Sequence, residues 1–469
     1  MRVGAPDASV TGFAGVSVLT ELVDRLGVVQ AIDAAVGPIK SRDRGLTAGG
    51  FLLALAQAQM CGQRALVGCD RRRADVVAEQ LSAVPTPAST TAASLARRFT
   101  PEQWLCVEDA LATVAARVVG LLPAPRRALL RAQAPTIDLD TTDTEVYGRA
   151  KDGVCFNHQG QRVGRTHLAT WAQAGLPLAA DLRDGRSDPR TYSPELMERA
   201  LTSLARIGVY RPADPAAPRP VFRMDAGYMS GALAWAAVEA ECDFAIGVRR
   251  GPAVWRALAE VPQDAWTPAD AMPAAEVAVA SYAPAGWPPG TTCLVRRVRY
   301  DAADLSGDPR ARRRRTVPAD QLALALDGEV DTVYAYSFIA TNLPVDSPAQ
   351  AIACEAWYRE RTDIEDRFRD AKHGAALDHL PSGNTGVNTA WLWAALLALA
   401  LSAWLQELAG LDHGDGRGRA HLGRLRHQVL AAPARLVRHG RQLLLRPAPT
   451  HHGILTTVLA RLRDLPATA

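Results

Sequence analysis

Four polar residues in the C-terminal third of the chain are spaced so that one face of a helix would carry them all. These four are Tyr358, Arg361, Glu365 and Lys372. At about 100° per residue, their directions fall within a sector of roughly 60°. A carboxylate can hold a metal ion, while a guanidinium, an ammonium and a phenol can bind phosphate oxygens. The combination suits phosphodiester chemistry. A solvated helix with ion pairs three and four residues apart gives the same pattern, so the interpretation depends on further carboxylates that can meet Glu365.

Two further carboxylates stand at the ends of predicted strands. Asp140 ends the strand predicted at 136–140, and Asp225 ends the strand predicted at 221–225. Strand ends of an open α/β sheet line the crevice in which ligands bind. A single aspartate at such a position is more often an exposed or capping carboxylate. Asp138 shares the sheet face of Asp140 because side chains alternate; we favour Asp140, which is nearer the loop, and Asp138 stays an alternative.

Three acids on two strand ends and a later helix form a candidate metal site. They can bind two Mg²⁺ ions about 3.5–4 Å apart around a scissile phosphate. One ion would activate a water or a 3′-hydroxyl, and the other would stabilise the leaving oxygen. Carboxylates are the hard ligands that Mg²⁺ prefers. We therefore expect Asp140, Asp225 and Glu365 to be the catalytic residues and metal ligands, with Mn²⁺ able to replace Mg²⁺.

Composition describes an ordinary globular protein with local basic patches. The chain has 469 residues, 48% of them hydrophobic and 22% charged, which predicts two or three domains. The net charge is only +4, and the basic residues concentrate at 71–73, 312–315 and 417–463. Such patches suit a polyanionic partner, although they are also common on solvated surfaces. The seven cysteines show no paired spacing, which argues against a zinc module and indicates a reducing, cytoplasmic location.

Hydrophobic periodicity divides the chain into five regions. The apolar run at 389–405 indicates a buried core helix rather than a membrane span, because it is short and lacks basic flanks. No phosphate-binding glycine loop is present, so no nucleotide cofactor is expected. The five regions are a helical N-terminal region at 1–125, an α/β core at 130–250, a β insertion at 251–345, the rest of the core with a long helix around 349–372 at 346–410, and a basic helical tail at 411–469.

The spacing Tyr-x2-Arg-x3-Glu-x6-Lys of the four polar residues resembles the signature of the insertion-sequence transposases of the IS-four superfamily. Residues 137–142 and 223–228 are similar to the segments that carry the first and second Asp of that DDE family. Leu380-Pro-Ser followed by Asn388, together with the run 434–441, resembles the thirteen-eighty-type branch. The acids Asp143 and Glu145, expected beyond the strand and solvated, depart from the pattern.

This resemblance implies an α/β fold: an RNase H-like catalytic core with a β-strand insertion, an all-α N-terminal region that binds DNA ends, and a helical C-terminal tail. It implies metal-dependent DNA cleavage and 3′-hydroxyl strand transfer at the ends of an insertion sequence. Tyr358, Arg361 and Lys372 would then contact DNA phosphates. The expected partners are double-stranded DNA, as terminal inverted repeats and target, and a second copy of the chain in a synaptic complex at the nucleoid. A catalytically inactive DNA-binding protein and a metal-dependent nuclease on the same fold are the alternatives.

Overall fold

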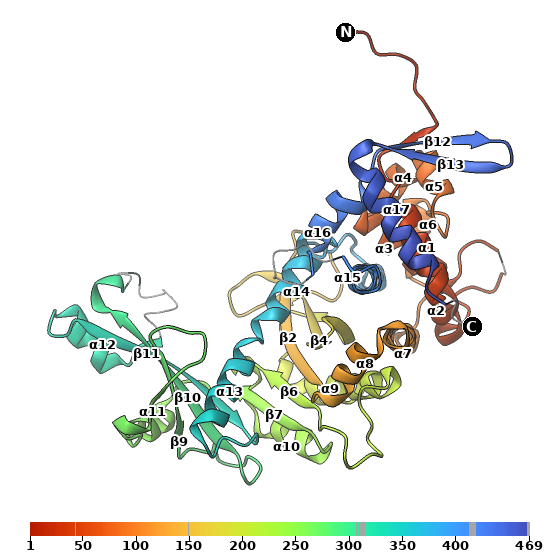
Figure 1. Cartoon of the computed structure of the whole chain (residues 1–469). Helices are drawn as coiled ribbons and strands as arrows, with labels where there is room; N and C mark the ends of the chain where they lie inside the picture. The colour runs from red at the N-terminus through yellow and green to blue at the C-terminus, as the bar shows by residue number, and fades with distance from the viewer. Residues whose placement is uncertain (43, 149, 306–307, 309–315, 412–418, 467–469) are drawn as a thin grey trace.

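The computed structural model describes the chain except for residues 43, 149, 306–307, 309–315, 412–418 and 467–469 (Figure 1). The basic run at 312–315 and the start of the basic tail at 417–418 lie outside the described residues. The fold is mixed α/β, with a helical N-terminal part, a long mixed sheet, and helices on both sides of the sheet.

Helices occupy most of the first 132 residues. The helices are α1 (Val16–Leu26), α2 (Val28–Val36), α3 (Ala48–Met60), α4 (Val67–Ala74), α5 (Val76–Gln80), α6 (Ser89–Ala96), α7 (Pro101–Leu121) and α8 (Ala124–Ala132). Every residue of α3 is buried, because this helix packs against the apolar helix α15 (Thr385–Leu408). Among the described helices, α15 alone is long and apolar enough to cross a membrane, and 89% of its apolar window is buried inside the protein. Such extensive burial indicates that α15 is a core helix of the fold.

One mixed sheet runs through the middle of the chain, in the order β3-β4-β2-β6-β7-β11-β10-β9-β8, with β5 also paired to β4. Its strands are β2 (Thr136–Glu145), β3 (Cys155–Phe156), β4 (Arg162–Trp171), β5 (Leu176–Asp184), β6 (Val221–Met224), β7 (Asp243–Gly247), β8 (Thr267–Pro268), β9 (Ala275–Ala280), β10 (Thr292–Asp301) and β11 (Thr332–Thr341). Strands β2, β6 and β7 are parallel, and the other pairings are antiparallel.

The expected β insertion extends this sheet rather than forming a separate one. Strand β11 pairs antiparallel with β7, so β8 to β11 continue the sheet beyond the parallel strands. With α11 (Pro252–Ala259) and α12 (Ala319–Leu326), these strands form the arm at the lower left of Figure 1.

The helices that follow β5 pack against the two faces of the sheet. Helices α9 (Pro189–Ile207), α10 (Gly231–Glu239) and α15 share one hydrophobic core with the apolar side chains of β2, β6 and β7. The helix expected around 349–372 is in fact two helices: α13 (Pro348–Arg359), which packs on the other face, and α14 (Thr362–His373), whose Ile364 and Phe368 join the same core. The chain between them, Glu360 and Arg361, lies beside the candidate site.

The C-terminal region departs from the expected helical tail. It contains α16 (Leu422–Leu425) and α17 (Pro449–Arg463), but also the hairpin of β12 (Ala434–His439) and β13 (Gln442–Pro447). Strand β1 (Val10–Thr11) pairs with β12, so a segment near the N-terminus joins the C-terminal hairpin in a small three-stranded sheet.

Candidate active site

Asp140 and Asp225 lie next to each other because two parallel strands deliver them to the same edge. In the pairing of β2 with β6, the last register partners are Leu139 and Met224, and each aspartate follows directly. Neighbouring strands are about 4.8 Å apart. Strand β2 does not end at Asp140 as predicted; it continues to Glu145 along β4, and only its pairing with β6 stops here. Two carboxylates thus stand side by side where the parallel pairing ends.

Asp138 lies on the same face of the sheet but has a different partner. Arg223, its register neighbour on β6, binds it through two hydrogen bonds of 2.6 and 2.9 Å. Both side chains are 1% exposed. Burial raises the pKa of Asp138, while the bonds and charge of Arg223 oppose this. Because its oxygens face Arg223, Asp138 is poorly placed to bind a ligand.

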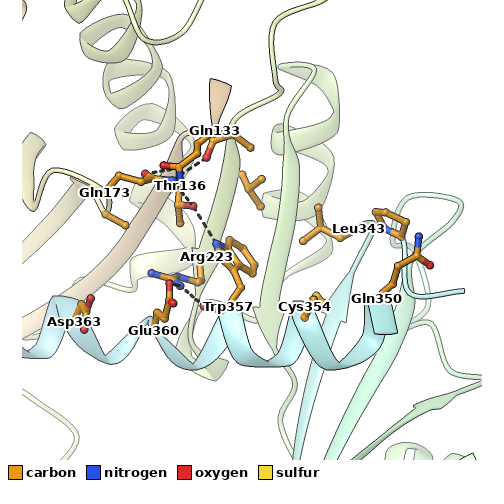
Figure 2. A pocket seen from close by; sticks show the side chains of 15 residues that line it. Gln133, Thr136, Gln173, Arg223, Leu343, Gln350, Cys354, Trp357, Glu360 and Asp363 are labelled. Atoms are coloured by element: carbon orange, nitrogen blue, oxygen red, sulfur yellow. Dashed lines mark hydrogen bonds and ion pairs between the residues drawn. The ribbon is translucent and has the colours of Figure 1, made fainter. Parts of the chain in front are cut away.

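Arg223 also connects the sheet to the end of α13. Its guanidinium donates to the carbonyl oxygen of Trp357 and lies over the Trp357 ring, 5.0 Å from the ring centre. Trp357 Nε1 in turn donates to Thr136 Oγ1 at 3.1 Å, as the dashed lines of Figure 2 show. These contacts fix the last turn of α13 against the starts and centres of β2 and β6.

The break between α13 and α14 aims Arg361 at the two aspartates. Around the break, backbone N–H groups bond three residues back rather than four: Arg361 N to Tyr358 O at 3.0 Å, and Ile364 N to Arg361 O at 3.1 Å. Such bonds tighten the turn to about three residues. The single helical stripe predicted for the four polar residues is therefore displaced at Arg361.

Arg361 forms a bridge between two of the three acids. Its Nη1 lies 3.2 Å from Asp140 Oδ2, and its Nη2 lies 3.4 Å from Glu365 Oε1. Asp140 and Arg361 are largely buried, with side chains 17% and 14% exposed, whereas Glu365 is 51% exposed. Asp140 and Glu365 thus share one guanidinium, with Glu365 at the solvent side in the first turn of α14.

The pKa of Asp140 reflects its burial and the charged side chains around it. Burial raises the pKa of Asp140 to about 6, helped by the negative charges of Asp225 and Glu365 and opposed by Arg361. Burial works to lower the pKa of Arg361, but the surrounding acids, Asp140 first, raise it. The site therefore holds more negative charge than its one guanidinium offsets, which is the condition that favours binding of a further cation.

Tyr358 and Lys372 anchor the two helices to the sheet. Tyr358 Oη donates to Met224 O at 2.7 Å, and Lys372 Nζ donates to Asp143 O at 2.9 Å. Burial raises the pKa of the Tyr358 phenol and lowers that of Lys372. The close approach of α13 depends on Gly247, where a Cβ would stand 2.7 Å from Ala226 N and 3.0 Å from Tyr358 Oη.

Asp143 was expected to be solvated, and this is wrong. Arg165 binds both of its oxygens, at 2.6 and 2.9 Å, and Asn157 Nδ2 donates at 2.9 Å. Burial alone would raise the pKa of Asp143, but these donors lower it. Asp143 is therefore held within the sheet, whereas Glu145 is exposed as expected.

The donor chemistry of the site fits a divalent cation, although the side chains are not gathered as ligands. Within the described part of the chain, no group of three His, Cys, Asp or Glu side chains is close enough to hold a metal ion. Arg361 lies among the three acids and neutralises part of their charge. Asp140, Asp225 and Glu365 are oxygen donors with excess negative charge, which suits Mg²⁺.

Of the cavities that border α13, two reach its C-terminal end. One, of about 600 Å³, adjoins the acids and is lined by Asp225, Tyr358 and Arg361 together with residues of β7, β10 and β11. The other, of about 690 Å³, lies beyond Trp357 at the start of β2 and β6 (Figure 2). The larger cavity is therefore not the one beside the carboxylates.

Sequence reasoning missed Arg223 and Trp357 as parts of this site. A signal for Arg223 was present: it precedes Asp225 by two residues, so alternation puts both on one strand face. Once β2 and β6 are recognised as parallel neighbours, Arg223 falls beside Asp138. For Trp357 no comparable signal exists.

Comparison with known proteins gives a family match and a weak likeness to a solved structure. The sequence matches the family described as Transposase DDE domain group 1 over residues 2–467. Among solved structures, a cryo-EM structure of the piggyBac transposase synaptic complex with hairpin DNA shows 8% sequence identity and a TM-score of 0.40, covering 97% of this chain and 82% of that chain. A likeness at this level bears on neither fold nor function. No curated protein matches the chain.

Proposed function

Because the chain belongs to the family Transposase DDE domain group 1, we propose that it cuts DNA at the ends of an insertion sequence and joins the freed 3′-hydroxyls to a target. The family match supports the transposase function. The observation that carries the chemistry is the adjacency of Asp140 and Asp225 at the end of the β2–β6 pairing, with Arg361 linking Asp140 to Glu365.

We propose that the chain belongs to the IS-four superfamily and its thirteen-eighty-type branch. Support for the superfamily comes from the spacing of Tyr358, Arg361, Glu365 and Lys372. Support for the branch comes from Leu380-Pro-Ser followed by Asn388, and from the run 434–441.

We propose further that β5, β4, β2, β6 and β7 form an RNase H-like core. In support, these strands are neighbours in that order, with β5, β4 and β2 antiparallel and β2, β6 and β7 parallel. Strands β8 to β11 would then be an insertion between the second aspartate and the glutamate.

Asp140, Asp225 and Glu365 would hold Mg²⁺ ions, two in number if the family pattern applies, or Mn²⁺ in their place. When bound, the ions would activate the attacking water or 3′-hydroxyl and stabilise the leaving oxygen. The protein contributes rigid placement: Asp225 Oδ1 accepts from Gly227 N at 2.7 Å, and Asp140 Oδ1 accepts from Thr141 N at 2.7 Å. One oxygen of each aspartate is thereby held by its own backbone, and the second oxygen of Asp140 contacts Arg361.

The cationic edge of the site is proposed to contact the DNA backbone. Arg361 can exchange its carboxylate partners for a phosphate, because a guanidinium binds both in the same bidentate manner. Lys372 uses one of its three N–H groups for Asp143 O. Tyr358 donates its hydroxyl proton to Met224 O, so a phosphate contact from Tyr358 requires that this bond be given up.

The N-terminal helices are proposed to recognise the DNA ends. Of the basic triplet at 71–73, Arg71 and Arg73 are exposed on α4, while Arg72 is buried and donates to Ala78 O and Ser82 Oγ. Two arginines of the triplet are thus presented to a partner. Pairing of two element ends would bring two copies of the chain together at DNA in the cytoplasm.

A strand-transfer assay with a donor that carries the element's inverted repeats tests the function. A joined product supports transposase activity, cleavage without joining indicates a nuclease, and binding without cleavage indicates an inactive DNA-binding protein. Full cleavage by Glu365→Gln would exclude the proposed role of that carboxylate.

A further inference from the structure

Charge distinguishes the cavity beside the carboxylates from the larger one. Four arginines line it, Arg250, Arg296, Arg359 and Arg361, against the two acids Asp225 and Glu355. Because Arg361 is already paired with Asp140 and Glu365, the other lining groups leave one positive charge. The cavity of Figure 2 is lined by one arginine, Arg223, and the two acids Glu360 and Asp363, which leaves one negative charge. A polyanion is therefore attracted to the first cavity and repelled by the second.

A buried glutamate holds two of these arginines in place. Glu355, on α13, is 1% exposed. Its Oε1 accepts from Arg296 Nη1 at 2.7 Å, and its Oε2 accepts from Arg359 Nε at 3.0 Å. One carboxylate thus fixes two guanidinium groups from different elements, β10 and the end of α13, and neutralises only one of their charges.

Both arginines retain hydrogen-bonding capacity. Arg296 also donates to Ser337 Oγ at 3.5 Å, and Arg359 also donates to Asp270 O. In the described structure each of the two therefore uses two of its five N–H groups. Two fixed guanidinium groups with donors to spare are suited to binding phosphate oxygens.

Resting on the proposed function, we propose that this cavity binds the phosphodiester backbone of a single DNA strand that continues from the scissile phosphate, with Arg296 and Arg359 as phosphate-binding residues and Glu355 as their positioning residue. The cavity adjoins Asp225 and Arg361, so a strand whose phosphate sits at the carboxylates can extend directly into it. At about 600 Å³ it is in the size range of small-ligand pockets. A strand of one or two nucleotides matches this size, and a double helix does not.

Binding of labelled DNA of arbitrary sequence, in the absence of metal, tests the proposal. The two probes are a blunt duplex and the same duplex with a single-stranded 3′ extension. Arg296→Ala and Arg359→Ala should each weaken binding of the extended probe about tenfold, the loss expected for one charged hydrogen bond. For the double variant, the slope of log K against log salt should fall by about 1.4, for two phosphate contacts on a single strand. Blunt-duplex binding should stay unchanged.

Matched controls remove an exposed arginine from β10 and another from α14, the helix that follows α13. Arg299 is exposed on β10, three residues from Arg296 and so on the opposite strand face. Arg369 is 62% exposed on α14 and pairs with Asp366. Arg299→Ala and Arg369→Ala should bind both probes like the unmodified protein. If they weaken the extended probe as much as Arg296→Ala does, general electrostatics explain the binding and the proposal is wrong.

The change in DNA affinity caused by Glu355→Gln distinguishes a positioning role of Glu355 from a purely electrostatic one. The substitution removes a negative charge, so a purely electrostatic cavity would bind DNA more tightly. The two arginines use different oxygens of Glu355, and an amide can accept from only one of them. We therefore expect weaker binding of the extended probe, with a folded protein shown by an unchanged circular dichroism spectrum. Tighter binding would overturn the positioning role.

The DNA-binding test of the cavity gives its result independently of the strand-transfer assay. If the unmodified protein joins DNA but the arginine variants bind the extended probe normally, this inference fails while the proposed function stands. If the arginines are required for binding but no cleavage occurs under any condition, the cavity assignment stands and the transposase function fails.

Discussion

Arg223 binds Asp138 through both carboxylate oxygens, at 2.6 and 2.9 Å, in a pair that is almost fully buried. Asp138 and Asp140 lie two residues apart on the same face of β2, but they bind different partners. Asp138 stabilises the fold by compensating Arg223, whereas Asp140 meets Arg361 at the rim of the site. Substitution of Asp138 should therefore affect a different property of the protein than substitution of Asp140.

Asp138→Asn should destabilise the protein, and Asp140→Asn should inactivate it. Removing one partner of a buried ion pair leaves a charge without compensation and costs about 3–5 kcal/mol of the free energy of unfolding. Loss of a carboxylate that holds a catalytic metal removes several kcal/mol of transition-state stabilisation, or about 10³-fold in cleavage rate. Denaturant unfolding and cleavage assays on both variants check this. Equal stability losses would contradict the assignment.

Metal addition should stabilise the protein without being needed for folding. The three acids carry more negative charge than Arg361 offsets, so a bound cation relieves repulsion in the folded state. At ten times its Kd, Mg²⁺ should add about 1.4 kcal/mol to the free energy of unfolding. Chelation should abolish cleavage and return the melting temperature to that of the metal-free protein.

The matching control is Asp225→Asn, which should show no rise in melting temperature with Mg²⁺. A rise equal to that of the unmodified protein would place the cation elsewhere.

Tyr358→Phe should loosen the end of α13. The lost hydrogen bond to Met224 O is worth about 1 kcal/mol of the free energy of unfolding. Because α13 leads directly into Arg361, cleavage should also slow. Tyr147, which is 82% exposed, provides the control, and Tyr147→Phe should change neither quantity. An unaltered cleavage rate in Tyr358→Phe would argue against a positioning role.

The parts of the site that follow from local pattern were predictable. Asp140 and Asp225 follow apolar strands, and such strand ends face ligand crevices. Glu365 was predictable only through its spacing from Tyr358, Arg361 and Lys372. What the pattern could not supply is the tertiary contact of each residue, such as the bond from Lys372 to Asp143 O. Those contacts depend on β2 extending to Glu145 along β4.

Two errors in the predicted elements have physical causes. The segment 349–372 has helical character throughout, but hydrogen bonds to the residue three back and the contacts of Arg223 with Trp357 divide it. The hairpin β12–β13 lies in the region 411–469, which was expected to be a helical tail. Its signal was Gly440, at φ 61°, in a two-residue loop between His439 and Gln442.

Acid should destabilise the fold through His167, which lies on β4 opposite Thr141 of β2. The ring is fully buried, and its Nε2 shares a hydrogen bond of 2.9 Å with Ser187 Oγ. Burial lowers the pKa of His167 to about 4, from about 6.5 for an ordinary histidine. Between these values the unfolded chain binds more protons than the folded chain, so stability is present above pH 6.5 and is lost as the pH falls toward 4.

His167→Gln should therefore reduce the drop in melting temperature between pH 7 and pH 5, even though the substitution lowers stability at pH 7. His158 is exposed on the loop after β3, and His158→Gln should leave the pH dependence as it is in the unmodified protein. The two variants share the loss of one imidazole and differ in burial, so desolvation is isolated as the cause. Identical pH profiles for the two variants would mean that His167 is protonated in the fold, which its enclosed position between β2 and β5 does not allow without local opening.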